Sequence, residues 1–134
     1  MENKLRIVLI NHSFQKEYYY RRWQLFAQNY KNVEVYLLTP AKVDWYATKE
    51  YTFSGAETVY GKVIDEENFH IRLFRLNFFG WSWFSTDYKK IFKEIQPDLI
   101  YHVGTHRMLS LIQVAMVSHR VCPKAKLALF SMRG

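Results

Sequence analysis

The chain has 134 residues, of which 49% are hydrophobic and 18% aromatic, which is too apolar for a disordered protein and enough for a buried core. Its formal net charge of +7 favours anionic partners without deciding among nucleic acid, anionic lipid and phosphorylated metabolites. A single cysteine excludes an internal disulfide, and no apolar run approaches the roughly 20 residues that span a bilayer. We therefore expect one cytoplasmic domain over residues 1–134.

The first forty residues predict a strand, a helix and a second strand. Leu5–Ile10 is almost continuously apolar, which is typical of a strand covered on both faces. Val33–Thr39 is a second such run, and Pro40 stops it. Between them, from Glu17 onward, apolar residues recur at helical spacing: Tyr19, Trp23, Phe26, Ala27 and Tyr30.

The middle of the chain is less regular. Residues 41–68 contain short alternating stretches around 58–64 that suggest a hairpin or an extended excursion, and Phe69–Phe78 predicts a third main strand. The following aromatic segment, Phe78–Phe84, has two interpretations. Its rings could seal the core beneath the next helix, or they could contact a sugar ring or a membrane interface.

The last third predicts a helix, a strand, a long helix and a final strand. Ser85 or Thr86 can cap the first helix, and Gln96-Pro97 ends it after an apolar stripe formed by Tyr88, Ile91, Phe92 and Ile95. Leu99–Val103 and Lys126–Met132 are buried-strand runs that enclose a helix over residues 107–121. We expect that helix to pack its wide apolar face on the core, through Met108, Leu111, Ile112, Ala115, Met116 and His119.

Strands that alternate with helices predict an α/β fold. We expect a Rossmann-like parallel sheet in the order 3-2-1-4-5, with helices on both faces because right-handed crossovers leave few other solutions. The strand order then reverses between the first and fourth strands, and ligands of such sheets bind at this switch point, outside the carboxyl ends of the strands.

The switch point selects the candidate site residues. Asn11, His12 and Ser13 follow the first strand, and His12 is our candidate catalytic base or hydrogen-bond donor, the alternative being a turn residue bonded to backbone. Thr105 can cap the last long helix, where Arg107 could bind an anion or remain a solvated side chain. We therefore expect substrate binding through Asn11, Ser13, Gly104, Thr105, His106 and Arg107.

Several common chemistries lack their motifs. The five glycines form neither GxGxxG nor a P-loop, which disfavours the usual dinucleotide and nucleoside-triphosphate cradles. The five histidines have no metal-ligand spacing, so we expect no metal. We interpret His102, inside the fourth strand, as a core histidine, and Cys122 as a buried small hydrophobe beside Pro123.

The order of motifs resembles the N-terminal domain of a family-4-like glycosyltransferase of the GT-B fold. Phe26-Ala27 followed by residues 31–40 resembles the family's helix, turn and "HEV-V-L-T" strand, and residues 96–104 resemble its "KPDVIHAHG" segment. Residues 124–134 end in Ser131-Met132-Arg133-Gly134, where the family has "T-x-H-G". Arg133 stands in place of the last histidine, and we add it to the expected substrate-binding residues.

The resemblance implies an acceptor-side domain that is truncated and inactive alone. The intact enzyme would transfer a sugar from a nucleotide-sugar, held mainly by a missing C-terminal domain, to a glycan or lipid-linked acceptor without a cofactor. A non-catalytic flavodoxin-like binding module is the alternative, and the scattered basic residues disfavour nucleic acid as partner. Arg72, Arg75, Lys89 and Lys90 flank Trp81 and Trp83, which suggests an acceptor at an anionic membrane surface.

Overall fold

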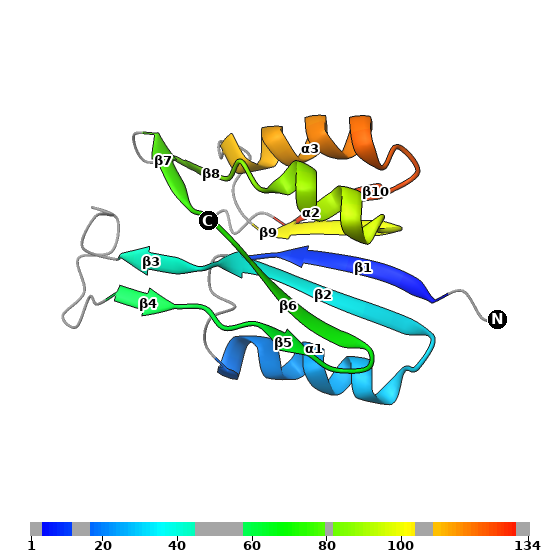
Figure 1. Ribbon diagram of the computed structural model, residues 1–134. Coiled ribbons are helices and arrows are strands. Elements are labelled where there is room, and N and C mark those ends of the chain that lie inside the picture. The colour runs from blue at the N-terminus through cyan, green and yellow to red at the C-terminus, as the bar shows by residue number, and fades with distance from the viewer. Residues whose placement is uncertain (1–3, 12–16, 45–57, 80–81, 104–108, 131–134) are drawn as a thin grey trace.

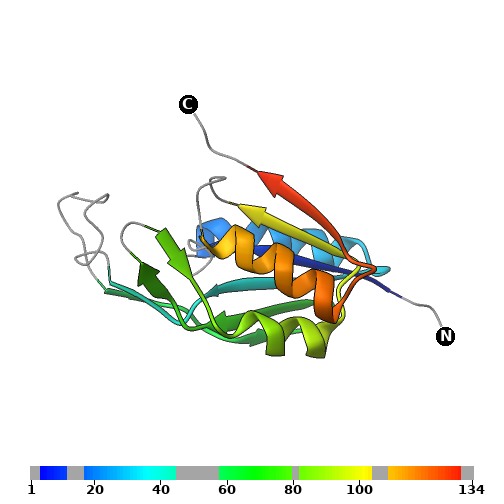
Figure 2. The same cartoon turned by 90° about the horizontal axis from the view of Figure 1, so that it is seen from above.

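A central sheet with helices on both faces forms the body of the molecule (Figures 1 and 2). The computed structural model describes residues 4–11, 17–44, 58–79, 82–103 and 109–130. Within these ranges the sheet contains β1 (Leu5–Ile10), β2 (Val33–Pro40), β5 (Ile64–Asp65), β6 (Phe69–Phe74), β9 (Leu99–Val103) and β10 (Lys126–Phe130). The helices are α1 (Glu17–Asn29), α2 (Tyr88–Ile95) and α3 (Leu109–Val121). Two antiparallel hairpins pair β3 (Lys42–Asp44) with β4 (Thr58–Tyr60), and β7 (Asn77–Phe79) with β8 (Ser82–Phe84).

The α/β class and a mostly parallel sheet are confirmed, but the strand order differs from the predicted one. The order is β10-β9-β1-β2-β6-β5, in which β5 pairs antiparallel with β6 and the other neighbours are parallel. The prediction contained no counterpart of β5, because a strand of two residues has no detectable period. β1 lies inside the sheet between β2 and β9, as its nearly continuous apolar run suggested.

The two faces of the sheet bury separate cores. Leu9, Val35 and Leu37 face α1 together with Phe69 and Ile71. The alternate residues of the same strands, Val8, Ile10 and Leu38, face the opposite layer, where they pack against α2 and α3. Figure 1 shows α1 below the sheet and the other two helices above it. Helices on both faces are therefore confirmed.

The predicted third strand and its aromatic extension needed correction. β6 ends at Phe74, and β7 pairs antiparallel with β8 outside the main sheet. The residue at the N-cap of α2 is Asp87 and not Ser85 or Thr86, although the Ser85 hydroxyl accepts the Asp87 N–H at 3.2 Å. The predicted apolar stripe of α2 is buried throughout, which confirms that helix.

The packing face of α3 was predicted wrongly. Its buried positions are Ser110, Val114 and Ser118, whereas Ile112 and Met116 point outward and are about half exposed. The error has a physical origin, because hydropathy assigns serine to the surface while both serine hydroxyls here have hydrogen-bond partners inside the protein. The buried face of α1 differs less from the predicted one than that of α3 does. Its fully buried residues are Tyr20, Gln24 and Ala27.

Candidate functional site

The carboxyl ends of the five parallel strands lie at one edge of the sheet. Both hairpins extend from this edge, since β3 follows the end of β2 and β7 follows the end of β6 (Figure 1). β1 and β9 are adjacent and parallel, so the chain leaves both strands at this same edge. From there it continues to β2 on one side of the pair and to β10 on the other, which makes the pair the switch point. This is the location in which open α/β sheets bind ligands.

Only one of the predicted site residues lies in the part of the chain that the structure describes. Asn11 directly follows β1, and its backbone N–H donates to the Leu38 carbonyl at 3.1 Å, which extends the pairing with β2 to the switch point. The remaining predicted residues lie outside the described ranges: His12, Ser13, Gly104, Thr105, His106, Arg107 and Arg133. Their proposed roles therefore stay predictions.

The chain that leads into β5 lies against the ends of β2 and β6. A Cβ atom at Gly61 would approach both the Pro40 carbonyl oxygen and the Leu73 side chain to 2.7 Å, so only glycine permits this contact. The Gly61 N–H donates to the Ala41 carbonyl at 2.9 Å, and the Ala41 N–H donates to the Phe74 carbonyl at 2.8 Å. This half of the edge is thus covered by the protein itself, which leaves the β1–β9 half as the candidate site.

A buried polar network lies directly beneath the switch point. His102 is opposite Ile10 in the β1–β9 register, and its Nε2 is 2.9 Å from the Ser110 hydroxyl at the start of α3. The same hydroxyl is 2.7 Å from the hydroxyl of Tyr88, the first residue of α2. All three side chains are fully buried, and burial raises the pKa of Tyr88 far above its usual range. The network therefore joins the end of β9 to the starts of both helices.

Residues around the start of α2 fix it to the strand ends. The Asp87 carboxylate accepts the Arg75 N–H at 2.7 Å and lies 3.4 Å from the Arg75 guanidinium. The Ser85 N–H donates to the Gln113 side-chain oxygen at 3.0 Å, which joins the end of β8 to α3. These pairs carry no local signal in the sequence, because their residues are 12 and 28 positions apart.

A cluster of charged side chains lies on β2, β5 and β6, on the face of the sheet that also packs against α2. His70 places one ring nitrogen 2.9 Å from Glu34 and the other 2.7 Å from Asp65, and Arg72 lies 2.8 Å from the same Asp65 oxygen. The hydrogen bonds from His70 and Arg72 lower the pKa of Asp65. Tyr36 stacks on His70 with ring centroids 4.5 Å apart, and burial together with the nearby Glu34 raises the pKa of Tyr36. Arg72 and Arg75, two of the basic residues of the membrane prediction, both form ion pairs.

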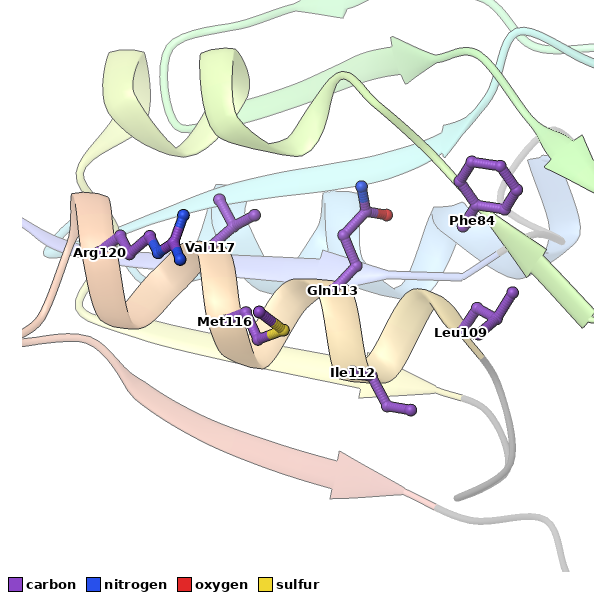
Figure 3. Close-up of a pocket in the computed structure, with 7 residues that line it drawn as sticks. All are labelled: Phe84, Leu109, Ile112, Gln113, Met116, Val117 and Arg120. Atoms are coloured by element: carbon purple, nitrogen blue, oxygen red, sulfur yellow. The ribbon is translucent and has the colours of Figure 1, made fainter.

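An open groove of about 540 Å³ runs along α3 (Figure 3). It begins at Phe84 and Leu109 and ends at Arg120, with Ile112, Gln113, Met116 and Val117 between them. Figure 3 shows Gln113 and Ile112 pointing to opposite sides of the helix. The walls are almost entirely apolar, so the groove can accept apolar groups and offers one guanidinium at its end.

Neither a metal centre nor a membrane-spanning helix emerges from the described ranges. No three His, Cys, Asp or Glu side chains in them are grouped to hold a metal ion. None of the helices found there is long and apolar enough to cross a membrane. His102 and Cys122 are both buried, as expected of core residues, and burial raises the pKa of the Cys122 thiol.

Comparisons with known proteins assign no family to the chain. Neither a scan of family models nor searches of curated proteins and solved structures found a match.

Proposed function

We propose that the chain is the acceptor-side, N-terminal domain of a GT-B glycosyltransferase. The observation that carries this proposal is the switch point: β1 and β9 are parallel neighbours, and the predicted site segments 11–13 and 104–107 directly follow them. The α/β sheet with helices on both faces also supports it. The intact enzyme would transfer a sugar from a nucleotide-sugar to a glycan or a lipid-linked acceptor.

The proposed mechanism divides the work between two domains. His12 accepts the proton of the acceptor hydroxyl as that oxygen attacks the anomeric carbon, and the nucleoside diphosphate leaves with the electron pair of the broken bond. Asn11, Ser13 and the 104–107 segment bind the acceptor, with Arg107 and Arg133 available for anionic groups. A second domain, which these 134 residues do not include, supplies most contacts to the donor.

Calorimetry with the isolated chain tests the division of labour. UDP- and GDP-sugars should bind no more tightly than millimolar, about −4 kcal/mol, because the domain that holds the donor is absent. Submicromolar binding of a nucleotide-sugar would contradict the assignment, and equally tight binding of a flavin or another small ligand would favour a flavodoxin-like binding module instead. Independently, the coding sequence should continue past Gly134 into a second Rossmann-like domain, and a stop codon there would contradict the proposal.

We also propose that the acceptor is presented at an anionic membrane surface. The net charge of +7 supports this location, since an excess of Lys and Arg attracts a protein to anionic lipid. Arg72 and Arg75 form ion pairs, and Lys89 and Lys90, the other two basic residues of the predicted contact, are exposed on α2.

A further inference from the structure

The outward face of α3 is apolar. Ile112 and Met116 lie one turn apart on it and are 53% and 55% exposed, while the opposite face of the helix packs on the core through Val114. A helix that is apolar on both faces is normally covered on both. Two large apolar side chains in succession on a solvent-facing helix therefore indicate a surface that contacts something apolar.

The apolar surface continues onto β10. Leu127 and Leu129 are 39% and 43% exposed, and they pair with Ile100 and His102 of β9. Side chains of directly paired residues point to the same side of a sheet, and Ile100 and His102 face the layer that contains α3. The leucines of β10 thus lie on the same side of the sheet as Ile112 and Met116. We call these four residues the α3 surface.

The segment that forms this surface carries charge of one sign. Residues 99–134 include five Lys or Arg and no Asp or Glu. Three of the basic residues, Arg120, Lys124 and Lys126, are exposed at the end of α3 and the start of β10. None of the three forms an ion pair with another residue of the described ranges. An apolar surface bordered by unpaired cations matches an anionic lipid interface.

We propose that the α3 surface docks on an anionic phospholipid bilayer, with Ile112 and Met116 entering the interface and Arg120 and Lys124 binding headgroups. This inference rests on the membrane-associated acceptor of the proposed function and names the surface that makes the contact. A bilayer is favoured over a second copy of the chain, because a second copy would present the same surface, and residues 99–134 contain no Asp or Glu to pair with these cations.

Sedimentation with vesicles tests the proposal with the isolated chain. Wild type should bind vesicles of phosphatidylglycerol and phosphatidylcholine at low salt, and bind pure phosphatidylcholine much more weakly. Arg120→Gln/Lys124→Gln should weaken binding roughly 25-fold, since each basic residue contributes about fivefold. Ile112→Gln/Met116→Gln should weaken it about tenfold.

The matched control, Arg22→Gln/Leu25→Gln, changes exposed residues of α1 on the opposite side of the sheet and should bind like wild type. Circular dichroism checks that each variant is folded.

Three outcomes would overturn the proposal. They are no binding of the wild type at low salt, equal binding to neutral vesicles, and equal weakening by the α1 control. Analytical ultracentrifugation adds a fourth, a dimer that Ile112→Gln/Met116→Gln dissociates, because a second copy would then cover the α3 surface. None of these results bears on sugar transfer to a soluble acceptor, so the domain assignment is tested separately by the calorimetry above.

Discussion

At the scale of single residues, the buried network of His102, Ser110 and Tyr88 depends most on its central hydroxyl. Ser110→Ala removes the partner of both the His102 Nε2 and the Tyr88 hydroxyl, and each buried group left without that bond costs about 1–3 kcal/mol. We expect Ser110→Ala to lower the free energy of unfolding by about 3 kcal/mol. Tyr88→Phe removes one hydroxyl but leaves the Ser110–His102 bond intact, so it should cost only about 1 kcal/mol.

Urea denaturation followed by circular dichroism measures both values. Both variants remove the Tyr88–Ser110 bond, but only Ser110→Ala also removes the contact with His102 and leaves the Tyr88 hydroxyl without this partner. Equal losses in Ser110→Ala and Tyr88→Phe would contradict the larger cost expected of Ser110→Ala.

Asp65 should account for part of the stability that the folded protein loses at low pH. Hydrogen bonds from His70 and Arg72 lower its pKa, so the carboxylate stabilises the folded state above the pKa of the unfolded chain and loses this contribution as the pH falls through the lowered folded value. Asp65→Asn should therefore lower the urea midpoint at about pH 7 and converge with wild type at about pH 2. The control is Glu67→Gln, whose carboxylate is largely exposed beside Lys31 and should have little effect at either pH. A constant difference between Asp65→Asn and wild type across this range would contradict the argument.

At the scale of elements, Gln96 ends α2 in an unfavourable backbone conformation. Its φ of 51° lies in the left-handed region, and its side-chain amide donates to the Val121 carbonyl at 3.0 Å and the Lys93 carbonyl at 3.2 Å. Gln96→Ala should be destabilising, because it keeps the backbone cost and loses these bonds. Gln96→Gly loses the same bonds but removes a cost of about 1 kcal/mol, so it should be more stable than Gln96→Ala by about that amount. Thermal unfolding of the pair checks this order, and the reverse order would show that the backbone is unstrained.

The sequence predicted correctly those elements whose buried residues are all apolar and form one stripe or one continuous run. β1 and α2 are examples, because burial alone determines which of their residues face inward. α3 is the counterexample: its inward face contains Ser110 and Ser118, and only the structure shows that the first bonds Tyr88 and His102 while the second donates to the Ala115 carbonyl. The β7–β8 hairpin was missed because its aromatic residues favour any strand equally.

At the scale of the whole molecule, the sequence predicts the sheet topology better than it predicts the geometry of the candidate site. The alternation of strands and helices was enough for the parallel sheet and for the two helical layers. The site residues follow strand ends, where polar loops have no periodicity that fixes their side chains. Asn11 alone among them lies within the described ranges, and it is bonded through its backbone, which any residue other than proline could provide. The hydrogen-bond partners beneath the strand ends, such as Ser110 for Tyr88, 22 residues away, carry no local signal in the sequence.

The sheet should open from its β5 edge and not from its centre. β1 is hydrogen-bonded on both sides, to β2 and β9, and Val8 and Ile10 within it are completely buried. β5 has two residues, one neighbour in the sheet and an exposed Asp65, so its bonds can break without disturbing either core. Amide hydrogen exchange should therefore show β1 exchanging only through global unfolding, with a protection free energy equal to that from urea denaturation, and β5 exchanging by local opening. Asp65→Asn should lower the protection of the two β5 amides, at positions 64 and 65, more than that of β1, because it weakens the bonds that hold β5 to His70 and Arg72. Equal loss of protection in β1 and β5 would mean that the sheet unfolds as one unit up to its edge.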